Sequence, residues 1–172
     1  MKKISFVLIA FLAFAAMSCG NGRMTEEKIS KLEKTMFNPD WSLNVDKSRE
    51  LVAAYCRYVD KNPKSEMSET YLFKAVDVSM NLPDVDKTFE IIDKFLAMYP
   101  DNERAPQVLF TKALIYDDNL RDYKNARKYY ELFVEKYPDH ELVRDAEASL
   151  RNLGKTPEQL IMEFEAQLQN TK

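Results

Sequence analysis

The sequence predicts an all-α protein, a solenoid of about three helical hairpins followed by C-terminal capping helices. Two stretches, residues 74–103 and 112–141, align without a gap at a constant offset of 38 residues. Both contain Tyr-Pro-Asp, at residues 99–101 and 137–139, and a weaker third copy ends at residues 62–63. Such a period is typical of repeats in which one pair of helices stacks on the next.

The first two expected helices are separated by a loop. Thr25 is a suitable N-cap for a helix whose Ile29, Leu32, Met36 and Phe37 share one face and which residues 38–40 (Asn-Pro-Asp) end. The loop contains the single tryptophan, Trp41, which we expect to cover a hydrophobic seam rather than to serve as a ligand platform. Residues 47–61 then form the second helix.

Two further hairpins follow, and the first of them begins at Ser65. An alanine at a helix crossing lets the two backbones approach closely, so Ala75 and Ala113 are expected at the crossings. The expected facing residues are Tyr71, Ala75 and Val78 against Ile92, Phe95, Leu96 and Tyr99, and then Leu109, Ala113 and Tyr116 against Ala126, Tyr130, Phe133, Val134 and Tyr137.

The C-terminal part, residues 154–172, is expected to form a separate last helix after a capping helix at residues 140–153. Gly154 is placed as a residue with positive φ after the capping helix. Thr156, Pro157 and Gln159 combine an N-cap, a first-turn proline and a capping-box glutamine. The last helix displays Leu160, Ile161, Phe164 and Leu168, which can fold back on the repeats or contact a partner.

The N-terminus has the pattern of a lipoprotein signal peptide, residues 1–18, with a cleavage site before Cys19. Two lysines precede an uncharged apolar run at residues 4–17, which is shorter than the roughly 20 residues that span a bilayer. The alternative is an uncleaved anchor helix. Cleavage leaves Cys19 as the lipidated residue and residues 19–24 as a short tether before the repeat domain at 25–153.

The repeats resemble the tetratricopeptide repeat (TPR) family. Tyr123 and Ala126 match the Tyr-x-x-Ala that opens its second helix, Pro138 matches the proline after that helix, and Ala113 matches the small residue of the first. Thr88 stands where the middle copy should have an alanine. The long period and Tyr-Pro-Asp endings look like TPR lipoproteins of bacterial envelopes, and residues 153–159 look like a group from the Bacteroidetes.

This resemblance implies an outer-membrane lipoprotein similar to the TPR lipoprotein of the β-barrel assembly machine and to the Tol-Pal TPR coordinator. Gly20 follows the cysteine in place of the aspartate that retains lipoproteins at the inner membrane, which favours the outer membrane. Residues 20–23 are not the acidic tract that carries some relatives to the cell surface, which favours the periplasmic side.

Composition argues against nucleic acid as a partner. Without Lys2 and Lys3 the chain has 23 Lys and Arg against 28 Asp and Glu, a formal charge of −5, so it offers no basic stripe for phosphates. Cys56 has no partner once Cys19 carries lipid. We expect a buried thiol there, with dimerisation through Cys56, and hence a homo-oligomer, as the alternative.

We expect neither an enzyme nor a cofactor site, because the sequence shows no familiar constellation of catalytic or ligating residues; a catalytic role, which would need an enclosed site around Asp117, is the third alternative. His140 is the single histidine, and it lies in a polar turn. The acidic group Asp117, Asp118 and Asp122 lacks the glycine and distal glutamate of a calcium loop. With three glycines in the whole chain there is no phosphate-binding loop, so we expect no catalytic residues, no metal and no cofactor.

In TPR proteins the first helix of each hairpin lines the face that accepts a partner, and the resemblance assigns that face here. It comprises Glu69, Leu72, Val76, Ser79 and Met80, then Gln107, Phe110, Leu114, Asp117 and Asp118. The alternative is that Leu72, Val76, Phe110 and Leu114 are buried by neighbouring helices. The function implied is a membrane-anchored adaptor for envelope proteins, which assembles or maintains an outer-membrane complex. The alternative function is a ligand-capture lipoprotein that assists nutrient uptake.

Cys19→Ala tests the lipid anchor. Because several acyl chains hold a lipoprotein on a bilayer where one chain would not, the variant should lose metabolic labelling by an alkyne fatty acid and leave the membrane fraction. A Cys56→Ala variant is the control and should keep both. A Cys19→Ala protein that still sediments wholly with membranes would contradict lipidation.

Overall fold

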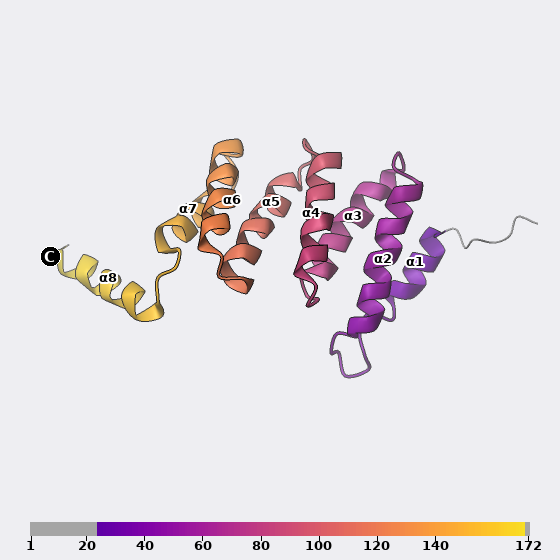
Figure 1. Cartoon of the computed structure of the whole chain (residues 1–172), viewed down its shortest axis with the longest axis horizontal. Helices are drawn as coiled ribbons and strands as arrows, with labels where there is room; N and C mark the ends of the chain where they lie inside the picture. Colours follow the sequence, from indigo (N-terminus) through magenta and orange to yellow (C-terminus); the bar gives the residue numbers. More distant parts are fainter. Residues whose placement is uncertain (1–23, 171–172) are drawn as a thin grey trace, which may run out of the picture.

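The computed structural model describes residues 24–170, without the side chains of 164 and 167–170, and this part of the chain forms eight α-helices that pack in sequence (Figure 1). Their bounds are α1 Glu26–Glu33, α2 Val45–Lys61, α3 Glu66–Ser79, α4 Val85–Met98, α5 Ala105–Leu114, α6 Tyr123–Lys136, α7 Val143–Asn152 and α8 Pro157–Asn170, and α5 continues into a π-helical turn at Ile115–Asn119. The all-α prediction is confirmed for these residues, which contain no sheet.

The predicted signal peptide at 1–18, Cys19 and the tether residues before Met24 lie outside the described residues. Among the residues that are described, no helix combines the length and apolar character needed to cross a membrane.

Polar side chains next to the helix starts explain where several helices begin. The predicted cap at Thr25 is confirmed: its hydroxyl accepts a hydrogen bond from the Lys28 N–H at 3.4 Å. Ser65, where the second hairpin was expected to begin, is also an N-cap, and its hydroxyl accepts a hydrogen bond from the Met67 N–H at 3.2 Å. Asn44 caps α2 and Asp84 caps α4 in the same way. These caps satisfy backbone donors that have no partner inside the helix.

The first helix is shorter than predicted. It ends at Glu33, so Met36 and Phe37 lie in a loop at residues 34–44. There the Asn44 N–H donates to the Met36 carbonyl at 2.8 Å, and Phe37 forms an isolated antiparallel bridge with Leu43. These contacts use backbone groups that a longer helix would have needed. The helix predicted at 140–153 likewise begins later, at Val143.

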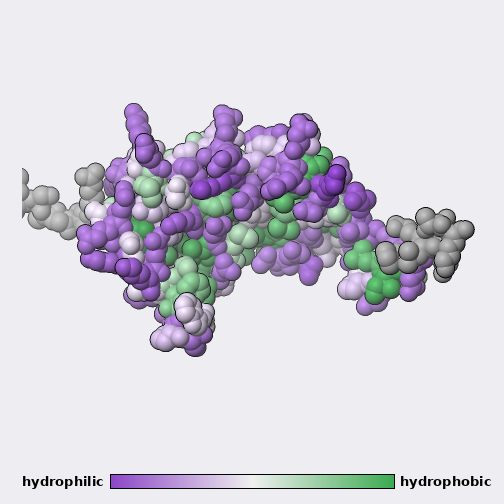
Figure 2. Space-filling model, turned by 180° about the vertical axis from the view of Figure 1, so that it is seen from behind, coloured by the Kyte–Doolittle hydropathy of each residue, from purple (hydrophilic) through white to green (hydrophobic). Residues whose placement is uncertain are grey.

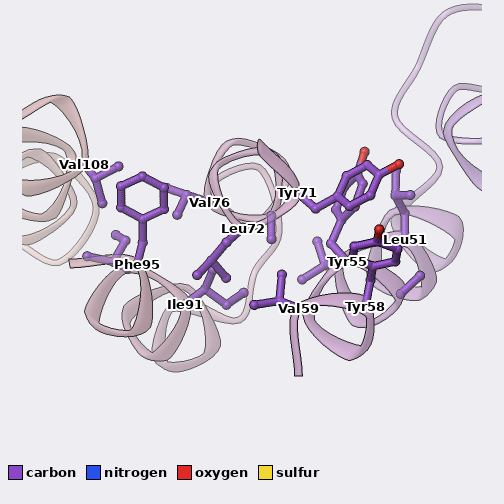
Figure 3. Packing of buried hydrophobic residues seen from close by; sticks show 14 of the residues in the cluster. Leu51, Tyr55, Tyr58, Val59, Tyr71, Leu72, Val76, Ile91, Phe95 and Val108 are labelled. Carbon is purple, nitrogen blue, oxygen red and sulfur yellow. The ribbon is translucent and has the colours of Figure 1, made fainter. Parts of the chain in front are cut away.

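The core runs continuously from α1 to α5. Figure 3 shows Leu72 and Val76 of α3 directed toward Ile91 and Phe95 of α4, with Val108 of α5 on the far side of Phe95. A second cluster joins α5, α6 and α7 through Leu109, Ala113, Ala126, Tyr130, Phe133 and Ala146. The predicted crossing residues Ala75 and Ala113 are fully buried.

A charged group ties α1 to the rest of the chain. The Glu33 carboxylate accepts hydrogen bonds from the Tyr55 hydroxyl at 2.7 Å and the Lys74 ammonium at 2.8 Å. Burial works to raise the pKa of Glu33, but these two donors outweigh it and hold the pKa below its usual value. The Tyr58 hydroxyl also donates to Glu26 at 2.9 Å. Tyrosines of α2 thus hold both ends of α1.

Lys112 performs a similar role between α4, α5 and α6. Its buried ammonium forms an ion pair with Asp93 and lies 4.5 Å from the centre of the Tyr129 ring. Tyr116 stacks between Phe89 and Tyr129, with ring centres 4.5 and 5.3 Å away. Burial opposes the lysine charge, but Asp93 and Tyr129 raise its pKa above the ordinary value. The cation therefore stays charged where three helices meet.

Thr88 occupies the position of the expected alanine without leaving a buried polar group unpaired. Its hydroxyl lies within hydrogen-bonding distance of two carbonyls, Ser79 at 3.0 Å and Asp84 at 3.1 Å. The side chain thereby links the end of α3 to the start of α4.

The C-terminal signals are confirmed, whereas the packing of α8 on the repeats is not observed. Gly154 has φ of +77°, and Thr156 and Gln159 form the reciprocal bonds of a capping box at 2.9 and 3.3 Å. Leu160, Ile161 and Met162 remain exposed, and α8 projects from the end of the array (Figure 1). Of the predicted face, Leu160 and Ile161 are therefore not buried against the repeats, whereas the side chains of Phe164 and Leu168 lie outside the described part of the chain.

Thr88→Val should lower the free energy of unfolding by about 1 kcal/mol, which is the net contribution of a typical hydrogen bond. The change keeps the side-chain shape and removes the hydroxyl, so a melting temperature a few degrees lower is expected in thermal denaturation followed by circular dichroism. The control is Thr70→Val, at a partly exposed position on α3. Equal melting temperatures for the two variants would contradict this role of Thr88.

Candidate functional site

The candidate site is a groove between α1, the 34–44 loop and α3. Two adjoining hollows, of about 460 Å³ and about 270 Å³, share Met36, Asp77 and Val78. The larger is completed by Phe37, Trp41, Leu43 and Asn81, and the smaller by Glu33, Leu51, Tyr55 and Lys74. We call this surface the α1–α3 groove.

Apolar residues gather on one face of the molecule. Figure 2 shows apolar surface along the middle of one face and on the loop that projects from it, with more hydrophilic residues at the edges. Phe37 and Trp41 of the loop, and Met80 at the end of α3, are large apolar side chains that remain exposed. Exposed apolar surface that gathers in one place, rather than singly, is typical of interaction sites.

The 34–44 loop is held in one shape by its own hydrogen bonds. The Trp41 N–H donates to the Asn38 carbonyl at 3.0 Å, and the Asn38 N–H donates to the Ser42 carbonyl at 2.9 Å. The Ser42 hydroxyl donates to the Asp40 carboxylate at 2.6 Å, and this bond contributes most to the lowered pKa of Asp40. The entropy cost of ordering this loop when a partner binds would therefore be small.

Trp41 does not cover a hydrophobic seam, so that prediction is wrong. Its side chain is 84% exposed, and its φ of 65° lies in the left-handed region that bulky residues rarely adopt. Such a conformation costs on the order of 1 kcal/mol and persists where surrounding structure imposes it. The fold therefore holds its one tryptophan at the rim of the groove, where it contributes little to the core.

The charges in the groove are unevenly paired. Glu33 and Lys74 neutralise each other, but the Asp77 carboxylate forms no ion pair or side-chain hydrogen bond with any described residue. Burial by neighbouring groups raises the pKa of Asp77, and Arg104 offsets part of that rise. Arg104 is itself engaged by Glu69 at 3.1 Å. Asp77 is thus an acidic group flanked by apolar Met36 and Val78.

The partner-facing residues predicted on α3 do not share one surface. Leu72 and Val76 are 0% and 1% exposed and belong to the core, as the alternative interpretation had it. Glu69 pairs with Arg104, and Met80 is exposed. The α3 residues that line the groove are Lys74, Asp77 and Val78. Successive residues of a helix point about 100° apart, so these three face a different direction from the buried Leu72 and Val76.

The residues predicted on α5 are also divided. Gln107 is exposed, whereas Phe110 packs against Tyr130 and Phe133 with ring centres 5.6 and 5.4 Å away, and Leu114 is partly buried in the same cluster. Asp117 lies in the π-helical turn and accepts a hydrogen bond from the Tyr130 hydroxyl at 3.3 Å. Burial, together with Asp118, raises the pKa of Asp117.

The sequence contained a signal for the groove that periodicity alone does not reveal. Met36, Phe37, Trp41 and Leu43 form a cluster of large apolar residues around an Asn-Pro-Asp turn, where polar residues would suffice. Such a cluster indicates that the loop contributes to an interaction surface as well as connecting two helices. Asp77 and Val78 could not be assigned in this way, because their exposure depends on how α1 and the loop cover α3.

Other candidate groups in the described chain offer little chemistry. No three His, Cys, Asp or Glu side chains between residues 24 and 170 are arranged to hold a metal ion. His140 accepts a hydrogen bond from the Leu142 N–H at 3.2 Å and packs against Phe133. Cys56 is a free thiol that is only partly buried, and burial raises its pKa, which lowers the fraction of reactive thiolate.

Comparison with known proteins adds no family assignment. No protein-family model matches the sequence, and a search of curated proteins finds no match.

Leu72→Ala should destabilise the fold because Leu72 fills the core rather than the groove. We expect a loss of roughly 2–5 kcal/mol in the free energy of unfolding, measured by urea denaturation. Leu132→Ala, at a position on α6 that is 40% exposed, is the matched control and should cost under about 1 kcal/mol. Similar losses for the two variants would mean that Leu72 is not a core residue in solution.

Proposed function

We propose that this chain is a lipid-anchored TPR-type adaptor that binds a protein partner in the bacterial envelope, where it assembles or maintains an outer-membrane complex. The observation that carries the proposal is the α1–α3 groove, which is open to solvent, has an apolar lining and is bordered by a preformed loop. A groove of this kind suits a segment of another protein better than it suits a small molecule, which is usually enclosed.

The repeat geometry supports the TPR-type assignment. Helices α4 and α6 begin and end 38 residues apart, at Val85 and Tyr123 and at Met98 and Lys136. Ala126 is fully buried at the position of the repeat alanine, and Thr88 is buried at the equivalent position. Stacked hairpins of this type expose a long surface on one side, which is the usual way in which repeat proteins recognise other proteins.

The lipid anchor supports the location. The signal peptide and Cys19 precede Met24 by a few residues, so lipidation would keep the repeats close to the membrane. A position on the periplasmic side of the outer membrane agrees with Gly20 and with the absence of acidic residues at 20–23. The role proposed is one of binding rather than catalysis.

Ligand capture for nutrient uptake is the second candidate. The larger hollow, at about 460 Å³, falls within the size range of small-molecule sites, although it is open rather than enclosed. A rise in melting temperature with a defined small molecule, which disappears in a Trp41 variant, would favour this alternative.

Photo-crosslinking in intact cells tests the adaptor role. A photoreactive phenylalanine analogue replaces Trp41 at the groove, or Leu132 on the exposed side of α6 as the control. The expected result is a reproducible adduct with one envelope protein from position 41 and not from position 132. Adducts that are the same from both positions, or that join only copies of this chain, would contradict a groove-specific partner.

A further inference from the structure

The occupant of the groove can be specified further, on the basis of the proposed adaptor function. Three features of the groove bear on it: the unpaired carboxylate of Asp77, the exposed ring of Trp41, and the apolar lining around Met36 and Val78. All four residues line the larger hollow, so one bound segment can reach them together.

Charge complementarity indicates that the bound segment carries a positive charge. Within the groove the Glu33 carboxylate is already neutralised by Lys74, and Tyr55 donates a second hydrogen bond to it. Asp77 has no such partner among the described residues, and the nearest guanidinium acting on it, Arg104, is held by Glu69 and the face of Phe73. Asp77 is exposed at the groove surface, so a cation supplied by the bound molecule can reach its carboxylate and form a charge-assisted hydrogen bond that no described residue provides.

Trp41 favours the same kind of group. Tryptophan offers the best aromatic face for a cation, and a lysine or arginine side chain can place its charge over the ring while its methylenes cover apolar surface. The loop hydrogen bonds fix the backbone at Trp41, so the ring is displayed at the groove before any partner arrives. An aromatic ring and a carboxylate on one hollow together select a cationic side chain over a neutral one.

The apolar lining adds a second requirement. The groove is lined by Met36, Leu43 and Val78. A purely hydrophilic peptide would make few favourable contacts with these side chains, so the cost of removing water from the peptide would not be offset. A methionine at such a position accommodates aliphatic and aromatic side chains of different shapes. An apolar residue next to the basic one would fill this part of the groove.

We propose that the α1–α3 groove binds a segment of a partner protein in which a lysine or arginine lies beside a large apolar residue, with the cation held by Asp77 and Trp41 and the apolar side chain held by Met36, Leu43 and Val78. This occupant is distinct from a nucleic acid, which the acidic balance of the chain disfavours, and from a second copy bound through its α8. The described start of α8 carries Glu158 and Glu163 but no basic residue.

The test is selection from a library of random heptapeptides displayed on phage, with the full-length chain purified in detergent. Peptides enriched by the wild-type protein should contain Lys or Arg within two residues of a large apolar residue. Asp77→Asn should weaken the best peptides about tenfold, as expected for one charge-assisted bond. Asp77→Lys should shift the enrichment from Lys and Arg to Asp and Glu.

Two further variants separate recognition from folding. Trp41→Asn keeps a residue type that tolerates positive φ, and it should reduce affinity about fivefold without lowering the melting temperature. Asp86→Asn, at an exposed aspartate of α4 outside the groove, should leave both affinity and selection unchanged. Three results would overturn the proposal. The enriched peptides could lack basic residues, the wild-type protein could enrich no more peptide than the Trp41→Asn protein does, or the best peptides could bind wild type and Asp77→Asn with equal affinity.

The crosslinking experiment distinguishes failure of the proposed basic and apolar recognition from failure of the adaptor role. If position 41 still forms its adduct with the same protein in an Asp77→Lys background, the adaptor function stands and the requirement for a basic residue falls. If wild-type protein gives neither an adduct nor an enriched peptide, both proposals fall together.

Discussion

The structure depends on apolar contact between each helix and the helices next to it in the chain. A helix that is apolar along one stripe cannot bury that stripe alone, and here successive helices supply the missing surface. Phe95 shows the arrangement well: it is fully buried, and residues of α3 and α5 pack on its two sides (Figure 3). The polar contacts at Glu33 and Lys112 sit on this framework and fix how neighbouring helices approach each other.

Features that depend on a few consecutive residues were predictable from the sequence. The caps at Thr25 and Ser65, the positive φ of Gly154 and the capping box at Thr156 are all set by local backbone geometry, so their residue types identify them. The 38-residue period predicted the order of the helices, because each hairpin of a repeat protein packs against the one beside it in the sequence. The all-α class follows from these local signals.

The candidate groove was not predictable in the same way, because it depends on which helix face the neighbours leave open. The resemblance placed Leu72 and Val76 toward a partner, but α4 and α2 cover that side of α3 and leave Asp77 and Val78 at the surface. Periodicity identifies an apolar stripe and not what covers it. Trp41 was misassigned because burial is the common state of a tryptophan, whereas here the loop hydrogen bonds hold it outward.

The way in which α8 is attached has a consequence for its own stability. Among its described side chains, α8 is supported by the cap at Thr156 and by an ion pair between Lys155 and Glu163 at 2.6 Å, while Leu160 and Ile161 are 37% and 58% exposed. Isolated helices of this length are marginal in water. The helix–coil equilibrium of α8 is therefore largely uncoupled from unfolding of the repeats, so its amide protons exchange, and its backbone becomes accessible to proteases, through openings that leave the rest of the array folded.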